Sequence, residues 1–144
     1  MSLLPRVAFA SVVLALSIPL VIVPASASNL EIDFSLTDHH GKTFRLQDQR
    51  GKVVLVFFGY TLCPDVCPIE LQYMATALKR LGQDSTRVRG LFVTIDPDHD
   101  TPEVLAQYVS YFDNALVGLT GTRHQIKEVA KMFRVIYQKN SRSS

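Results

Sequence analysis

Cys63 and Cys67 are the residues whose types and spacing most clearly indicate chemistry. They are the two cysteines of the 144-residue chain and lie in the segment CPDVCP at positions 63–68. A structural disulfide across so short a loop would remove little entropy from the unfolded chain, so stability does not explain the pair. Two thiolates can instead bind Cu(I), a soft ion that accepts soft ligands, or can cycle with a disulfide. Spacing alone leaves copper binding and redox chemistry open.

A helix that starts at the thiols would favour either chemistry. Pro68 is predicted to be its first residue, because the proline ring presets φ and the missing N–H would be unpaired there. The partial positive charge and the free N–H groups of a helix N-terminus stabilise thiolate and lower its pKa. We therefore expect the sulfur atoms of Cys63 and Cys67 to converge at this helix start.

Acidic residues are expected around the same site. Asp65 lies between the cysteines, and the segment DPDHDTP at positions 96–102 carries Asp96, Asp98 and Asp100. Aspartate often forms turns by bonding its own backbone, and this is our interpretation of Asp96 and Asp100. Asp65 is interpreted as a residue that tunes the thiols or contacts a partner.

One of the four histidines is a candidate copper ligand. His99 lies in the acidic segment, and we hypothesise that it provides a third ligand beside Cys63 and Cys67. His39 and His40 are interpreted as residues of a solvated turn. His124 is interpreted as a surface residue at the start of a helix.

Hydrophobic patterning predicts the elements that must position these residues. Residues 34–46 predict two short strands around a turn at 38–41, followed by a polar connection at 47–51. The apolar runs at 53–58 and 88–95 predict two further strands, the first buried on both faces, and residues 116–119 predict a short strand. Three helices are expected: one ends at Gly82, one starts at Thr101-Pro102, and one starts with a capping box at Thr122 and Gln125. Their expected apolar faces are formed by Leu71, Met74, Leu78 and Leu81 in the first, by Leu105, Tyr108, Val109 and Phe112 in the second, and by Ile126, Val129, Ala130 and Phe133 in the third.

Strands that alternate with helices imply an α/β fold with a mainly parallel sheet and helices on both faces. In such sheets, ligands bind at the carboxyl ends of the strands. The cysteine pair follows one predicted strand and the acidic segment follows the next. Both should therefore lie on one rim of the sheet.

Residues 1–27 are predicted to be a secretory signal, or a membrane anchor that is never cut. Arg6 precedes an apolar run at 7–23, and Ala25-Ser26-Ala27 offers small residues for cleavage. The domain would then occupy residues 28–139, with a polar tail at 140–144, in the bacterial periplasm or on the periplasmic face of the inner membrane. Membrane association through residues 3–23 is the alternative. The 15 basic and 13 acidic side chains nearly balance, which argues against nucleic-acid binding.

Three ordered motifs resemble those of the Sco/SenC family, the copper chaperones for cytochrome c oxidase assembly. They are FGYTLCPDVCP at 58–68, VTIDPDHDTP at 93–102 and GLTGT at 118–122. The resemblance implies a thioredoxin-like fold and copper held by both cysteines and one histidine. It also implies copper delivery to the oxidase's dinuclear copper site, or reduction of that site's thiols. A Cys63–Cys67 disulfide belongs to the redox form of this expectation.

The family pattern continues beyond the third helix, into an antiparallel strand pair and a last helix. The copper histidine of the family lies in that continuation, and no residue of this sequence matches it. We therefore expect a domain that is incomplete at its C-terminus, with one edge of the sheet exposed.

The leading functional expectation is a copper metallochaperone rather than an enzyme. Its partner would be the copper-bearing subunit of cytochrome c oxidase or another copper or thiol protein. The first alternative is a thiol–disulfide oxidoreductase in which Cys63 attacks and Cys67 resolves the mixed disulfide. The second alternative is a fragment without function.

Overall fold

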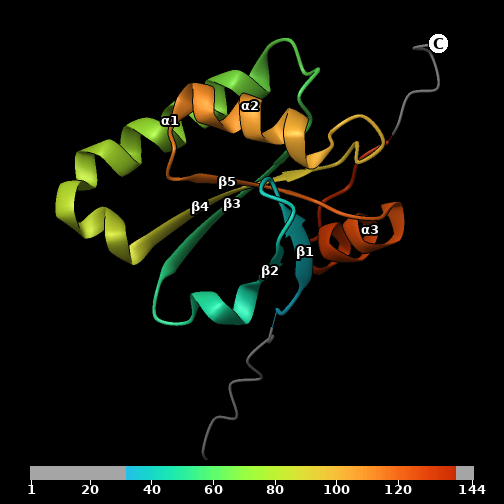
Figure 1. Cartoon of the computed structure of the whole chain (residues 1–144), viewed down its shortest axis with the longest axis horizontal. Helices are drawn as coiled ribbons and strands as arrows, with labels where there is room; N and C mark the ends of the chain where they lie inside the picture. The colour runs from blue at the N-terminus through green and yellow to red at the C-terminus, as the bar shows by residue number, and fades with distance from the viewer. Residues whose placement is uncertain (1–31, 139–144) are drawn as a thin grey trace, which may run out of the picture. The chain divides into compact units, whose positions relative to one another are not determined.

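A five-stranded mixed sheet forms the centre of the computed structural model, which describes residues 32–138 (Figure 1). The strand order is β2-β1-β5-β4-β3. The pairings β3–β4 and β4–β5 are parallel, whereas β1 is antiparallel to both β2 and β5. The strands are β1 (Ser35–Asp38), β2 (Thr43–Arg45), β3 (Val53–Gly59), β4 (Val88–Thr94) and β5 (Leu116–Thr120). The predicted leader at 1–27 and tail at 140–144 lie outside the described residues.

Helices cover both faces of the sheet, as the alternation of elements predicts. Helices α1 (Val66–Leu81) and α2 (Pro102–Phe112) pack on one face, and α3 (Arg123–Met132) packs on the other (Figure 1). Short 3₁₀ helices occupy Leu46–Gln49 and Gly82–Arg87, so the predicted polar connection at 47–51 begins in a helical turn. Within residues 32–138, no helix combines the length and the apolar character that a membrane crossing requires.

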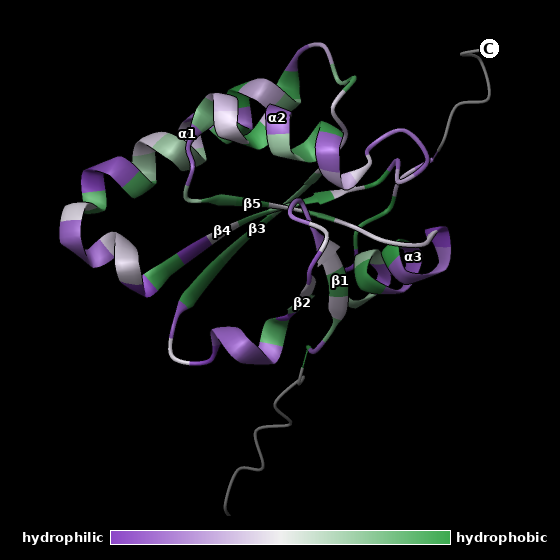
Figure 2. Cartoon of the chain, viewed as in Figure 1, coloured by the Kyte–Doolittle hydropathy of each residue, from purple (hydrophilic) through white to green (hydrophobic). Residues whose placement is uncertain are grey.

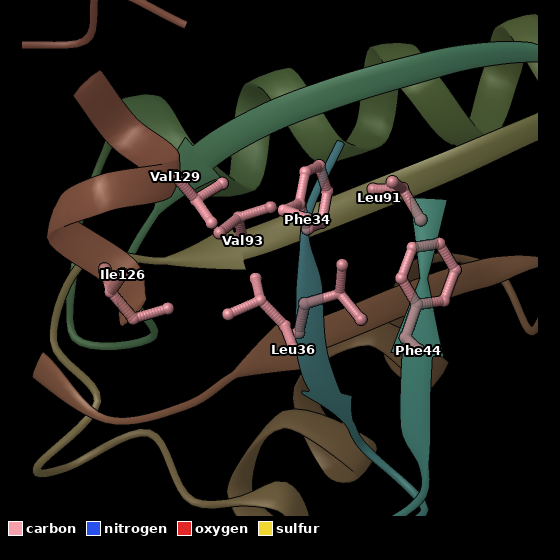
Figure 3. Packing of buried hydrophobic residues seen from close by; sticks show 8 residues of the cluster. Phe34, Leu36, Phe44, Leu91, Val93, Ile126 and Val129 are labelled. Atoms are coloured by element: carbon pink, nitrogen blue, oxygen red, sulfur yellow. The ribbon is translucent and has the colours of Figure 1, made fainter. Parts of the chain in front are cut away.

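Two hydrophobic clusters lie on opposite faces of the sheet. Side chains alternate along a strand, so β4 sends Leu91 and Val93 to the α3 face and Phe92 to the α1–α2 face. Figure 3 shows Ile126 and Val129 of α3 directed toward Val93 and Leu36. Strands β3, β4 and β5 are coloured mainly as hydrophobic, whereas hydrophobic and hydrophilic residues alternate along the helices (Figure 2). This layering supports the predicted α/β class.

The helix boundaries follow the capping signals in two helices and depart from them in the third. Thr101 caps α2 and Pro102 is its first residue, and Thr122 and Gln125 form the predicted capping box of α3. The predicted start of α1 is wrong, because the helix begins at Val66, two residues before Pro68. Proline is equally tolerated there, since none of the first four helical N–H groups has an intrahelical partner.

The inward face of α1 also differs from the predicted stripe. Cys67, Leu71, Ala75 and Leu78 are buried, whereas Leu81 is 42 % exposed. Gly82, with φ of +53°, ends the helix as predicted. Because Leu81 is the last residue of α1, it lies beyond the part of the helix that packs on the sheet.

The prediction that the strand at 53–58 is buried on both faces is wrong. Among the described residues β3 pairs with β4 alone and forms one end of the sheet, so solvent reaches its side chains from the open side. Val54, Val56 and Phe58 are half-buried against the α3-side cluster, and Val53 is 60 % exposed. The continuous apolar run therefore reflects contact on two faces, but not full burial.

Candidate thiol and copper site

The thiol pair lies where β3 ends and α1 begins. A close approach of α1 to β3 is possible because residue 59, the last residue of the strand, is glycine. A Cβ atom at this position would lie 3.0 Å from Cys67 Sγ and 2.8 Å from a ring carbon of Phe92. The absent side chain therefore makes room for the Cys67 sulfur against the end of the strand.

Both cysteines are free thiols, and both are nearly buried. Cys63 is 9 % exposed and Cys67 is 3 % exposed. The Cys67 N–H donates a hydrogen bond to Cys63 Sγ at 3.4 Å. The expected convergence at the first turn of a helix is therefore confirmed. A Cys63–Cys67 disulfide stays a prediction.

The two thiols differ in their acidity. Burial alone would raise the pKa of Cys63, but hydrogen bonds from the Cys67 thiol and from the N–H groups of Cys67, Asp65 and Val66 outweigh it, so the pKa is lowered. Burial raises the pKa of Cys67 to about 11, and the hydrogen bond and the charge of Cys63 act in the same direction. Cys63 is therefore the thiol that ionises first.

A buried carboxylate, Asp100, connects the loop that carries the thiols to the loop that follows β4. It accepts hydrogen bonds from the Thr61 N–H at 3.1 Å, from Thr61 Oγ1 at 2.5 Å and from Thr94 Oγ1 at 2.6 Å. Its exposed fraction is 0 %. The interpretation of Asp100 as a local turn former is wrong, because its partners lie in another loop and at the end of β4. The prediction that both loops share one rim of the sheet is confirmed.

The other acids of the rim are more accessible. Asp98 forms an ion pair with Arg123 at the start of α3, with a shortest distance of 2.5 Å. The carbonyl of Asp96 accepts from the N–H groups of His99 and Asp100, so Asp96 begins a turn as interpreted. Asp65, between the cysteines, is exposed and precedes the first residue of α1.

The histidines have three different environments. The His99 side chain is 44 % exposed, with its Nδ1 atom 3.0 Å from Asp100 Oδ1. In residues 32–138 no group of three His, Cys, Asp or Glu side chains is arranged to hold a metal ion, so His99 as a third copper ligand stays a prediction. His39 is not a solvated turn residue, because its Nδ1 accepts the Gly118 N–H of β5 at 3.0 Å. His40 and His124 are exposed, as expected.

Sequence reasoning missed Tyr108 as a residue of the site. Its hydroxyl is the one buried side-chain polar atom in the described part of the chain that lacks a hydrogen-bond partner. Burial raises the pKa of Tyr108 to about 12, and the negative charges of Cys67, Cys63 and Asp100 add to the effect. Tyr108 matches the apolar period of α2, so no sequence signal separated it from the core. Thr61 was missed for a different reason, since its partner Asp100 is 39 positions away. Thr94 was also missed, although it is six positions from Asp100.

The donor set fits a soft monovalent metal. Two thiols, one of them acidified, can hold Cu(I), which accepts as few as two soft ligands. The same pair can exchange with a disulfide, since one thiol ionises readily and its neighbour stays protonated. The geometry therefore supports copper binding and thiol exchange.

Known proteins similar to this chain include one whose structure contains bound copper. The sequence profile of the SCO1/SenC family matches residues 23–144. A SCO2-like protein of Rickettsia typhi is 41 % identical over 104 residues, which cover 72 % of this chain and 51 % of the relative. The copper-bound structure of Bradyrhizobium japonicum ScoI is similar with a TM-score of 0.70 and 38 % identity, over 76 % of this chain and 73 % of that one.

A second similar structure concerns redox chemistry. BsSco, a member of the Sco family of cytochrome c oxidase assembly proteins in which a disulfide switch was identified, has a TM-score of 0.65 and 28 % identity. The alignment covers 75 % of this chain and 66 % of BsSco. The chain spans about half the length of the Rickettsia relative, which is 51 % covered. These similarities identify the fold as the thioredoxin-like fold of Sco proteins.

Proposed function

This chain belongs to the SCO1/SenC family, and from that premise we propose that it is a copper metallochaperone in the assembly of cytochrome c oxidase. Its cargo is Cu(I), held by Cys63 and Cys67. The partner is the copper-bearing subunit of the oxidase, which receives the metal at its dinuclear copper site. The observation that supports this proposal is the buried thiol pair at the start of α1, in which N–H groups help to lower the pKa of Cys63.

The residues around the thiols have separate roles in this proposal. The N–H groups of residues 65–67 stabilise the Cys63 thiolate, which is the first ligand to form. Cys67 keeps its proton until the metal displaces it, because burial opposes its ionisation. Asp100 holds the two rim loops together, so the sulfur atoms keep their separation while the metal enters or leaves.

Copper binding is tested by titrating the full chain with Cu(I) in the presence of a competing chelator. We expect about one equivalent to bind per chain, and Cys63→Ser or Cys67→Ser to abolish it, since a single thiolate leaves the ion with one soft ligand. The hypothesis that His99 is a third copper ligand is tested with His99→Ala. An unchanged Cu(II) spectrum in this variant excludes His99 as a ligand. Retention of tight Cu(I) binding in both cysteine variants would contradict the proposal.

A second function is favoured by the opposite pKa directions of the two thiols. The Cys63 thiolate would attack a disulfide of the partner, and one partner sulfur would leave as thiolate. Cys67 would then attack the mixed disulfide, so that the partner dithiol is reduced and Cys63–Cys67 is oxidised. The same cysteine variants test it: Cys67→Ser should trap the mixed disulfide, whereas Cys63→Ser should form none.

Export to the periplasm, or attachment to the periplasmic face of the inner membrane, completes the proposal. Residues 1–27 support it through their basic, apolar and small-residue order. Copper delivery at the outer face of a membrane-bound oxidase requires this compartment. Fractionation of cells that produce the full chain distinguishes cleaved protein, membrane-anchored protein and cytoplasmic protein.

A further inference from the structure

An apolar stripe runs from the thiol loop along the solvent side of α1. Its four residues, hereafter the α1 stripe, are Leu62, Val66, Ile69 and Tyr73, which are 63 %, 55 %, 46 % and 66 % exposed. Positions 66, 69 and 73 lie on one side of a helix because they follow the spacing i, i+3, i+7. The buried residues of α1 start at Cys67 and face the sheet on the other side. The helix is therefore apolar on two sides, and packing within the described chain explains one of them.

The α1 stripe begins next to the two thiols. Leu62 precedes Cys63 and Val66 precedes Cys67, and both apolar side chains are far more exposed than the cysteines that follow them. Each of these apolar side chains therefore lies next in sequence to a thiol that a partner has to reach. Exposed apolar residues that cluster at a functional site indicate a contact surface for a macromolecule.

Acidic side chains lie at the thiol end of the α1 stripe, whereas the basic residues of α1, Lys79 and Arg80, lie in its last turn. Residues 59–78 contain no lysine or arginine, but they contain the exposed acids Asp65 and Glu70. The loop at 95–103 adds further acids and also lacks lysine and arginine, although Arg123 from α3 pairs with Asp98. The thiol end of the apolar surface therefore has an acidic frame.

We propose that the α1 stripe is the docking surface for the partner that exchanges copper or disulfide with Cys63 and Cys67. The inference rests on the proposed function and adds the chemistry of recognition: the partner presents an apolar contact bordered by lysine or arginine. The stripe is small, which suits a transient encounter rather than a permanent interface.

The test uses the full chain and, as probe, the isolated metal-free copper domain of the oxidase subunit. The second-order rate of Cu(I) transfer to this domain is measured by stopped flow for Ile69→Ser and for Tyr73→Ser. We expect each rate to fall about tenfold, because each substitution removes a large part of a buried apolar contact. Leu81→Ser and Tyr111→Ser are the matched controls, since these residues are 42 % and 84 % exposed outside the stripe. Their transfer rates should match that of the unmodified chain.

The acidic frame is tested with charge reversal. Glu70→Lys should lower the transfer rate several-fold, and this loss should shrink at high salt, because opposite charges speed association mainly through long-range attraction. Asp84→Lys, in the 3₁₀ helix after α1, is the control that changes the same net charge elsewhere. An equal effect of the two reversals would overturn the charge argument.

Two further measurements separate this inference from the proposed function. Cu(I) affinity against a small chelator should be unchanged in all stripe variants, because the chelator does not need the stripe. Binding of the domain to the copper-free chain, followed by NMR titration, should weaken in Ile69→Ser and Tyr73→Ser. If the unmodified chain binds no copper but the domain still docks on the stripe, the chaperone function fails and the docking surface stands. Equal docking and equal transfer in stripe and control variants would overturn the docking surface. The proposal would also be overturned if the chain formed a dimer and Tyr73→Ser converted this dimer to monomers.

Discussion

Gly59 decides how close the Cys67 sulfur can come to the strand. A side chain at this position would meet Phe92 Cε2 at 2.8 Å and Cys67 Sγ at 3.0 Å. These atoms belong to the packed interior, so one of them has to move if a methyl group is added. The residue is therefore as much a part of the thiol site as the cysteines.

Gly59→Ala is predicted to destabilise the fold by about 1–3 kcal/mol, the usual cost of overpacking a well-filled core. It should also change the rate at which Cys67 is alkylated, because the sulfur must shift. Chemical denaturation and mass spectrometry of alkylated protein measure the two effects. Gly90→Ala is the control. Its added Cβ would clash with Leu116 of β5, and Gly90 lies toward the start of β4, whereas Gly59 pairs with the last residue of β4. It should lower stability without altering the thiols, and an equal change in Cys67 reactivity would contradict the argument.

The sequence was informative about single residues where the signal was local. The thiols at the helix start and the caps of α2 and α3 follow from residues within one turn of each other, and the structure confirms them. The burial of Asp100 could not be predicted, because its partner Thr61 is 39 positions away. Likewise, the bond between His39 and Gly118 depends on how the β1–β2 turn meets β5, which is a tertiary contact.

At the scale of elements, Asp100 fixes the loop after β3 to the loop after β4. It accepts from two threonine hydroxyls and one backbone N–H while fully buried. A buried carboxylate is tolerated only when such donors compensate its lost hydration. The hydrogen bonds thus hold together two loops that a parallel sheet merely brings near each other.

Asp100→Asn is predicted to lower the free energy of unfolding by about 2 kcal/mol. The amide NH₂ group of asparagine would face the hydrogen-bond donors that the carboxylate now accepts from, so a buried donor would lose its acceptor. The negative charge of Asp100 contributes to the raised pKa of Cys67, so the pKa of Cys67 should fall in this variant. Thermal unfolding and pH-dependent alkylation of Cys67 in a Cys63→Ser background measure the two changes. Asp98→Asn is the control: it breaks the exposed pair with Arg123, which should cost much less stability because solvent screens the pair. The idea fails if the two variants are equally stable.

The elements also show where periodicity was insufficient. The run at 53–58 predicts a strand correctly, but apolar composition does not distinguish a strand at the end of a sheet from a central one. The position of β3 is set by the order β2-β1-β5-β4-β3, a property of the whole sheet. The start of α1 was misplaced because proline suits several positions of a first helical turn equally well.

For the molecule as a whole, stability should depend on pH through His39. Burial and the neighbouring His40 lower the pKa of His39 below its ordinary value of 6.5, and the neutral ring accepts the Gly118 N–H. The folded state therefore favours the neutral form. Its contribution is fully present above pH 6.5 and is lost as the pH falls through the lower pKa of the folded state.

We predict that thermal stability falls between pH 7 and pH 5 and that part of this fall disappears in His39→Ala. The contribution should stay below about 1 kcal/mol, since the ring is only partly buried and solvent screens it. Calorimetry at several pH values measures the effect. His124→Ala, which changes an exposed histidine at the start of α3, should keep the full pH dependence. A fall of equal size in both variants would exclude His39 as the cause.

The central position of β4 has a consequence for the cooperativity of this domain. Leu91 and Val93 belong to one hydrophobic cluster, and Phe92 belongs to the other. If one layer unfolded alone, one face of β4 would be exposed to solvent. The other layer needs the same strand to stay in place. The α3 layer and the α1–α2 layer are therefore coupled through three consecutive residues, and the rim that carries the thiols persists or disappears together with both.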